Sequence, residues 1–421
     1  MTLSLPPSPC LGSHESGLLT ISNLALEGSR LLEDSSRASR NVETDTSMRA
    51  PLPPLTAYEV SEATGFVPEA DPVIRLSRFD PWEDLAPEIS ALIRTRRLRA
   101  ALSRLPELDA AGLQTAGERE RGLLLLTVFA NGWVWGGVEP DLTIPQQIAR
   151  PLCMLAEAMG RPPIVHYASM ALNNWRRLDR SQPVSADNVR MQVQFLGGVD
   201  EDWFFVGSLG VELAGAPLVA SAHAAVEASE RHGDAELQAA LTKVSADLDP
   251  VIAALARMYE WCDPHVFYHR VRPYLRGWPD PGVVYQGASE TPQTFVGGSA
   301  GQSTLIQAVD AVLGVQHRPA ATADYLKRLR TYMPSPHRRL VEDIEARTVV
   351  RRRVETGSAG LHAAYNEAIA QLDRFRRRHI ELANRYIVKP SGGSTVEKGT
   401  GGTDLEVFLE AARGSTAEAR L

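Results

Sequence analysis

The sequence predicts an all-α fold with a small N-terminal helical domain and a larger C-terminal one. Its 421 residues are 44% hydrophobic and 23% charged, a composition that excludes a wholly disordered or coiled-coil chain. From Pro81 onward, runs rich in Ala, Leu and Arg follow acidic first turns, which is typical of helices. Almost no segment alternates β-branched and polar residues with the period of two that predicts a strand.

The expected helices and strands follow from the spacing of hydrophobic residues along the chain. Helices are expected at 84–103, 117–135, 144–159, 204–228 with a break at Pro217, 235–262, 304–313, 321–332, 336–346 and 359–387. Short strands are expected at 189–195 and 283–285. The domains are then a flexible extension (1–55, rich in Ser, Leu, Pro and Arg), a small helical domain (56–195), a large helical domain (196–412) and a tail (413–421).

Charge and cysteine content narrow the functional classes. The chain has 44 Lys and Arg against 51 Asp and Glu, a net charge of −7, so no overall basic surplus attracts nucleic acid or an anionic membrane. Cys10, Cys153 and Cys262 are far apart, which suggests neither a disulfide framework nor a thiolate zinc site, and we expect a cytoplasmic protein. The apolar run 122–138 contains Asn131 and is shorter than the roughly 20 residues of a membrane span, so a buried core helix is expected.

The last long helix carries a histidine on its apolar stripe. Spacings of four and three place one face of this helix in the core, formed by Leu361, Tyr365, Ala368, Leu372, Phe375, His379, Leu382 and Tyr386. From the stripe alone, His379 is either a core histidine bonded to the backbone or a metal ligand; neutral imidazole is the usual axial ligand of haem iron. Arg376, one turn earlier, either meets a haem propionate or is a solvated or salt-bridged arginine.

Three further segments combine residue types that suit a binding site. GGSAGQST (297–304) is either a helix-capping loop or a place where the backbone approaches a flat ligand, and its lack of Lys argues against a phosphate-binding loop. FYHRVRPYLRGW (267–278) is either an amphipathic surface helix or a site whose aromatic rings and guanidinium hold an aromatic amino acid. KGTGGTD (398–404) is either a disordered tail or an active-site lid.

In this order the segments resemble the indoleamine 2,3-dioxygenase family, from about residue 58 to 411. The matching stretches are RPPIVHYASMALNNW (161–175), WFFVGSLGVE (203–212), FYHRVRPYLRGW, VVYQG followed by FVGGSAGQST, YMPSPHRRL (332–340), GLHAAYNEAIAQLDRFRRRHIELANRYI (360–387) and KGTGGTD. The resemblance implies a two-domain helical haem dioxygenase fold with haem b in the large domain. It places the proximal iron ligand at His379, Ser299 and Ala300 at the haem edge, Arg376 near a propionate, and Asp310 as support.

The resemblance also implies a substrate site on the distal side of the haem. It places Phe204 and Ser208 over the haem, and Phe267, Tyr268 and Arg272 at the substrate. Thr400 falls on the lid. A pocket-wall position that is tyrosine in the family corresponds here to Trp133, and Tyr268 and Arg276 also depart from the family pattern. These departures bear on which substrate side chain the protein prefers more than on the type of reaction.

The implied reaction inserts both atoms of O2 into the indole 2,3 double bond of L-tryptophan or a related indoleamine. The product is N-formylkynurenine, in the first step of the kynurenine pathway, and a reductant keeps the iron ferrous. Arg272 and Ser208 are the expected catalytic residues, with Arg272 anchoring the substrate carboxylate. We expect a monomer. Two alternatives stay open: a related haem enzyme acting on another indole derivative in secondary metabolism, and a haem-binding sensor without turnover.

Overall fold

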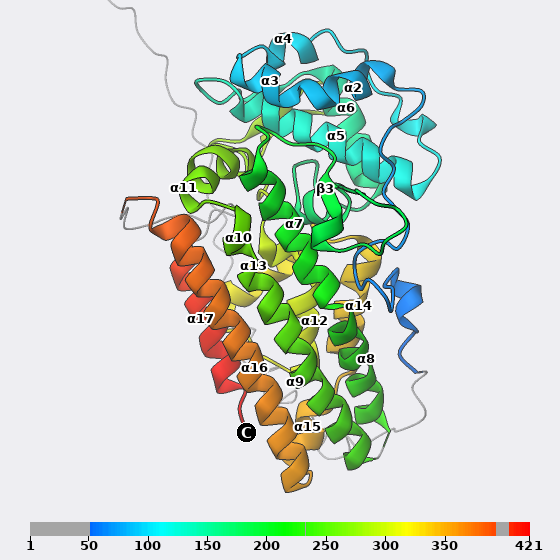
Figure 1. The fold of residues 1–421 in the computed structure, drawn as a ribbon, viewed down its shortest axis with the longest axis vertical. Coiled ribbons are helices and arrows are strands. Elements are labelled where there is room, and N and C mark those ends of the chain that lie inside the picture. The colour runs from blue at the N-terminus through cyan, green and yellow to red at the C-terminus, as the bar shows by residue number, and fades with distance from the viewer. Residues whose placement is uncertain (1–50, 232, 393–403) are drawn as a thin grey trace, which may run out of the picture. The chain divides into compact units, whose positions relative to one another are not determined.

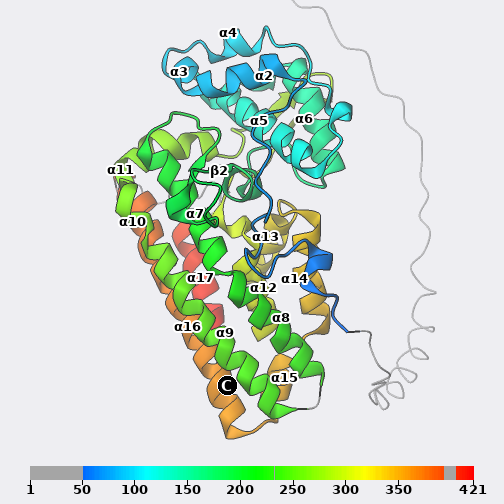
Figure 2. The same ribbon diagram turned by 45° about the vertical axis from the view of Figure 1, so that its right-hand side comes forward.

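The computed structural model describes residues 51–231, 233–392 and 404–421, and from Leu52 onward they form one compact unit (Figures 1 and 2). Helices dominate this unit and the strands are short, so the predicted all-α fold is confirmed. The division predicted between residues 195 and 196 stays a prediction. Leu52 and Leu55 are both buried in the core, so this compact unit includes residues before the predicted boundary at 56.

The N-terminal helices gather at one end of the unit in both views. They are α2 (Asp80–Leu85), α3 (Ile89–Arg94), α4 (Leu98–Leu102), α5 (Ala116–Trp135) and α6 (Gln146–Ala158). The single helix predicted at 84–103 is wrong, because a 3-10 turn at Ala86–Glu88, which contains Pro87, interrupts it, and Arg96 adopts a φ of 58° between α3 and α4. The predicted core helix at 117–135 is confirmed as α5. A capping box of Thr115 and Glu118 begins it, and its residues 121–132 are buried.

Three long helices form the centre of the rest of the unit. They are α7 (Val199–Ala214), α8 (Ala216–Glu230) and α9 (Asp234–Ala256), and α9 packs against both of the others. The predicted break near Pro217 is present, with Gly215 between α7 and α8. By length and composition alone, the run Val199–Glu230 could cross a membrane, but 56% of the tested window is buried inside the protein, as in a core helix.

The strands are short and form two small sheets. β1 (Thr143–Ile144) pairs in parallel with β4 (Val283–Tyr285), which pairs antiparallel with β5 (Ser289–Gln293). β2 (Trp175–Arg177) pairs antiparallel with β3 (Val189–Met191). The strands predicted at 189–195 and 283–285 correspond to β3 and β4. Between α9 and β4, the chain forms the short helices α10 (Met258–Trp261) and α11 (Pro264–Val266).

The C-terminal half is again helical. Its elements are α12 (Thr304–Leu313), α13 (Ala320–Arg330), α14 (Ser335–Arg347), α15 (Val350–Glu355), α16 (Ala359–Ala383) and α17 (Leu405–Glu418). The tail predicted at 413–421 is wrong: most of it belongs to α17, which packs on α16. Ser415 and Thr416 are buried, and the Ala419 carbonyl accepts a hydrogen bond from Arg351.

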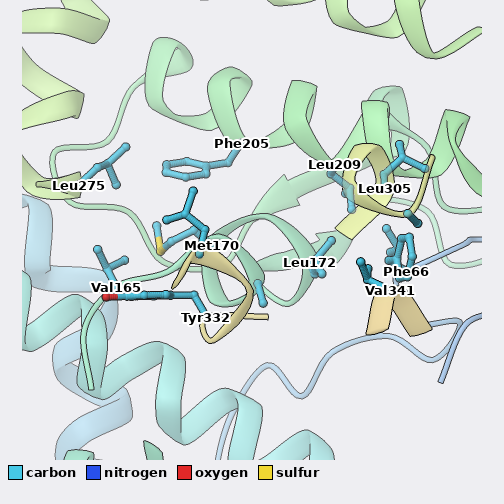
Figure 3. Packing of buried hydrophobic residues seen from close by; sticks show 14 of the residues in the cluster. Phe66, Val165, Met170, Leu172, Phe205, Leu209, Leu275, Leu305, Tyr332 and Val341 are labelled. Carbon is cyan, nitrogen blue, oxygen red and sulfur yellow. The ribbon is translucent and has the colours of Figure 1, made fainter. Parts of the chain in front are cut away.

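Apolar side chains from both halves of the sequence meet in one core. Figure 3 shows Phe205 and Leu209 of α7 above Met170 and Leu172, which belong to the π-helical turn Ala168–Leu172. All four side chains are at most 6% exposed. This packing fixes the turn at Ala168–Leu172 against α7, the helix on which several predicted site residues lie.

Candidate active site

One cavity collects most of the residues that the sequence singled out. It has a volume of about 240 Å³, and it lies among α7, α12, α16, α17, the turns after α11 and the loop at 298–303. The predicted residues that line it are Phe204, Ser208, Phe267, Arg272, Ser299, Ala300, Asp310, Arg376 and His379. The segments at 267–278 and 297–304 therefore contribute to the cavity, and the first is not a surface helix.

His379 lies on α16 with its ring at the cavity. The rest of the predicted stripe is buried, whereas His379 is half-buried because it faces this space. Among the residues that the structure describes, neither of its ring nitrogens has a hydrogen-bond partner. Burial lowers the pKa of His379 to about 4, and the charge of Arg376 acts in the same direction. The ring is therefore neutral at ordinary pH, with a nitrogen lone pair available to a ligand of the cavity.

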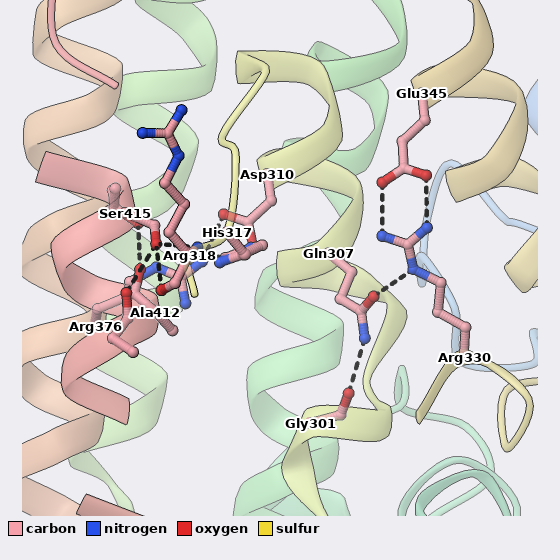
Figure 4. Close-up of polar contacts among 12 residues, drawn as sticks. Gly301, Gln307, Asp310, His317, Arg318, Arg330, Glu345, Arg376, Ala412 and Ser415 are labelled. Atoms are coloured by element: carbon pink, nitrogen blue, oxygen red, sulfur yellow. Dashed lines mark hydrogen bonds and ion pairs between the residues drawn. The ribbon is translucent and has the colours of Figure 1, made fainter. Parts of the chain in front are cut away.

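Arg376 and Asp310 join α16 to α12 beside His379 (Figure 4). Nη2 of Arg376 donates to both carboxylate oxygens of Asp310, at 2.5 and 2.6 Å, and Nε2 of His317 lies 3.1 Å from Oδ2. Although burial alone would raise the pKa of Asp310, the Arg376 charge and the His317 contact hold it below its usual range. Nε of Arg376 is buried and has no partner within the described ranges, so this guanidinium has a donor left for a ligand.

The side of the cavity that is expected to be distal to the haem is built on α7. Phe204, Ser208 and Glu212 follow one another at intervals of four residues, which places all three on one face of the helix. The Phe204 ring lies 4.2 Å from the Phe267 ring, between centroids. Ser208 donates its hydroxyl to the Phe204 carbonyl at 2.8 Å, so this proton is not offered to a ligand in this geometry.

Arg272 lies at the start of the 3-10 turn Arg272–Leu275, after the π-helical turn Phe267–Val271. Its side chain is buried, lines the cavity, and stacks over the Tyr268 ring at 5.2 Å. Tyr268 itself is not among the lining residues. Arg276 is exposed and lies 5.7 Å over the Trp135 ring, so this departure from the family pattern lies outside the cavity lining.

The loop at 297–304 both caps α12 and borders the cavity. Its conformation needs Gly297, since a Cβ there would lie 2.0 Å from the Leu275 carbonyl oxygen. At Gly298, which lines the cavity, the nearest atoms to an added Cβ belong to Val165 at 4.0 Å, so this position leaves open space. Gln302 holds the loop by donating to the Gly297 carbonyl and accepting the Tyr167 backbone N–H, both at 2.8 Å.

Two of the predicted residues that the structure describes, Tyr268 and Trp133, do not appear in the cavity lining. Trp133 is near the end of α5 and its indole N–H donates to the Thr143 carbonyl at 2.8 Å, so the expected tryptophan in the pocket wall is a misassignment. An aromatic residue that does line the cavity is Tyr167, which donates its hydroxyl to Glu212 at 2.9 Å. Thr400, the predicted lid residue, lies outside the described residues.

Sequence reasoning missed Tyr167 and Glu212. Both lie within stretches that carried the family resemblance, 161–175 and 203–212, so aligning those stretches residue by residue could have identified them. Nothing in the periodicity of either segment distinguishes them from ordinary buried residues.

Comparison with known proteins shows which family the chain resembles over most of its length. The family described as Indoleamine 2,3-dioxygenase matches residues 54–419. A rat indoleamine 2,3-dioxygenase 1 is 33% identical over 390 residues, covering 87% of this chain and 96% of that protein. A 6-hydroxytryptophan 2,3-dioxygenase of Fusarium equiseti is 31% identical over 392 residues, covering 86% and 96%. A protein named myoglobin from Haliotis madaka is 31% identical over 380 residues, covering 86% and 97%.

Proposed function

The chain belongs to the indoleamine 2,3-dioxygenase family and is thus a dioxygenase of indoles, and from that premise we propose that its substrate is L-tryptophan. The proposed reaction adds both atoms of O2 across the indole 2,3 double bond and gives N-formylkynurenine. The proposed cofactor is haem b, held through His379.

The observation that carries this proposal is that one cavity contains both an unpartnered neutral imidazole and a buried guanidinium. His379 would hold the iron, because its ring is neutral and has a free lone pair at the cavity. Arg272 would hold the carboxylate of an amino acid, because it lines the same cavity and its planar fork matches a carboxylate. A haem-binding protein without turnover would not need the guanidinium of Arg272 to hold an amino acid.

Other described residues fit a haem group as well. The spare Nε donor of Arg376 suits a propionate, and the Ser299 hydroxyl is a second polar group at the cavity. Gly298 leaves room beside it for a flat macrocycle. When bound in its ferrous state, haem would supply the binding and activation of O2.

The protein residues then act by positioning. Phe204 and Phe267 offer aromatic faces against which an indole ring can pack. Arg272 fixes the other end of the amino acid, and the apolar wall excludes water from the reacting carbons. Ser208 contributes as part of this wall, since its proton is donated to the helix backbone.

The names of two relatives correspond to the two alternative functions, a dioxygenase of another indole and a haem protein without turnover. The name of the Fusarium protein specifies a ring-hydroxylated tryptophan, and that of the Haliotis protein specifies an oxygen carrier. The test is to reduce the haem-loaded protein without oxygen, add O2 with L-tryptophan, 6-hydroxytryptophan or tryptamine, and identify products by mass. We expect N-formylkynurenine and the highest kcat/KM with L-tryptophan. A preference for the hydroxylated substrate, or oxygen binding without any product, would replace the proposal with the matching alternative.

A further inference from the structure

We infer that Glu212 is a positioning residue that holds Tyr167 and the loop at 298–303 in place around the substrate. The inference rests on the proposed function only in calling the ligand of this cavity a substrate. It concerns a residue with no assigned role in the proposed reaction.

Glu212 connects two hydroxyl groups from distant parts of the sequence. It lies on α7 one turn after Ser208, is 2% exposed, and lines the cavity. Its Oε1 accepts hydrogen bonds from the Tyr167 hydroxyl at 2.9 Å and from the Ser303 hydroxyl at 2.6 Å. In the described part of the chain no cation pairs with this carboxyl group, and Oε2 is buried without a partner. Oε1 of Glu212 thus links α7 to Tyr167 in the cavity wall and to Ser303 at the end of the loop.

Both hydroxyl partners line the cavity, and each lies where a helical segment begins. Tyr167 immediately precedes the turn Ala168–Leu172. Ser303 caps α12, its side chain accepting the Leu305 N–H at 3.3 Å. Because α12 also carries Asp310, the contact through Ser303 reaches the helix that binds Arg376 on the proximal side. Loss of the shared acceptor would release the wall and the loop together.

The role needs an acceptor oxygen and not a negative charge. Burial raises the pKa of Glu212, against the opposing effect of the two hydroxyl hydrogen bonds. A neutral carboxylic acid still presents a carbonyl oxygen that can accept both hydroxyls. Glutamine offers the same oxygen with nearly the same shape, whereas leucine offers none and leaves two buried hydroxyls unpaired.

The same helix supplies a matched control. Glu201 lies on α7, is fully buried, and accepts the backbone N–H groups of Phe195, Leu196 and Gly197 at 2.6 to 2.9 Å. It does not line the cavity. Substituting Glu201 therefore disturbs an equally buried acid of α7 without touching Tyr167 or Ser303.

The experiment measures amide hydrogen exchange in the haem-loaded protein, which needs neither substrate nor turnover. In Glu212→Leu, peptides covering 167–172 and 298–303 should exchange about tenfold faster, the factor equivalent to one lost hydrogen bond, while those covering 195–197 stay unchanged. Glu201→Gln should show the reverse pattern, because both Glu201 oxygens accept backbone N–H groups and the amide nitrogen of glutamine cannot accept them. Glu212→Gln should stay within about threefold of wild type, since it keeps the acceptor. Unchanged exchange at 167–172 and 298–303 in Glu212→Leu, or equal acceleration in Glu212→Gln, would overturn the inference.

Steady-state kinetics then separate positioning from general damage. For L-tryptophan, Glu212→Leu should raise KM about tenfold with kcat and haem content nearly kept. Should Glu212→Leu fail to fold, Tyr167→Phe and Ser303→Ala take its place; each removes one hydroxyl and should accelerate exchange in its own segment about threefold or more. No acceleration in either variant contradicts the inference. A wild type without any product refutes the proposed function, but leaves the exchange result to decide the role of Glu212.

Discussion

Arg376 holds both carboxylate oxygens of Asp310 through one nitrogen, Nη2, at 2.5 and 2.6 Å, and so ties α16 to α12 one turn before His379. The two side chains are 12% and 8% exposed. The pair links the helix that carries the proposed iron ligand to the helix that follows the glycine-rich loop (Figure 4).

Breaking this pair should weaken both the fold and haem retention. Asp310→Ala leaves a buried guanidinium without its partner, which costs about 3 to 5 kcal/mol of unfolding free energy. Urea unfolding and the rate of haem transfer to an acceptor protein measure the two effects. Arg374→Ala, which removes an exposed ion pair with Asp249 from the same helix, should cost less than about 1 kcal/mol. Equal costs for the two variants would contradict the importance given to the buried pair.

Removing the proposed iron ligand should abolish stable haem binding. In His379→Ala the cavity keeps its walls but loses its neutral imidazole, so haem absorbance should be lost or become dependent on added imidazole, which can fill the space. His265→Ala removes an exposed ring outside the cavity lining and should leave the spectrum intact. A normal histidine-ligated spectrum in His379→Ala would refute the assignment.

Truncating Arg272 should affect the amino-acid substrate and not the haem. Loss of one partner of a buried charge pair costs about 2 to 5 kcal/mol, so Arg272→Ala should lower kcat/KM for L-tryptophan roughly 30-fold or more. Arg272→Lys should recover only part, because an ammonium group cannot form the two-pronged contact. Wild type should prefer L-tryptophan over tryptamine far more strongly than Arg272→Ala does. The same preference in both proteins would mean that Arg272 does not bind the carboxylate.

Helices with a strong hydrophobic periodicity were predictable, because the pattern that defines each helix lies within its own segment of the sequence. The predicted helix at 304–313 matches α12 residue for residue, and the stripe on α16 correctly puts His379 on the inner face. The break of the predicted helix at 84–103 depends on a left-handed Arg96, which few sequence patterns signal. Residues 413–421 have the composition of a polar tail. Ser415 and Thr416 can nevertheless be buried, because their hydroxyls donate to backbone carbonyls one turn earlier in the same helix.

The site was less predictable than the helices, since contacts between segments define it. The family resemblance identified the lining residues Phe204, Arg272 and His379. It also suggested Trp133, whose indole N–H instead donates to a nearby backbone carbonyl outside the cavity lining. Tyr167 becomes recognisable only when its hydroxyl is seen to meet Glu212, 45 residues further along the chain.

A buried histidine outside the cavity should make stability depend on pH. His166 accepts a hydrogen bond from Arg161 at Nε2, 3.1 Å away, and donates from Nδ1 to the Ile164 carbonyl, so the ring is neutral. Burial, together with the Arg161 charge, lowers the pKa of His166 to about 3, against about 6.5 in the unfolded chain. Below pH 6.5 the unfolded state therefore binds the extra proton.

The stability from His166 is thus complete above about pH 6.5 and is lost as the pH falls towards 3. The unfolding free energy should drop by about 1.4 kcal/mol per pH unit from this group, or roughly 2 kcal/mol between pH 6.5 and 5. His166→Gln should flatten the slope of urea midpoints against pH by that amount, while the similar contribution of His337 remains. Parallel slopes in wild type and His166→Gln would show that His166 is protonated in the folded state.

The most direct test of the proposed function is the fate of oxygen. The reduced, haem-loaded protein is given L-tryptophan and oxygen-18 gas, and the product is analysed by mass spectrometry before it can exchange with water. The account predicts N-formylkynurenine carrying both oxygen-18 atoms, formed over many turnovers. A product with one labelled oxygen, or labelled gas bound and released without any product, would contradict it.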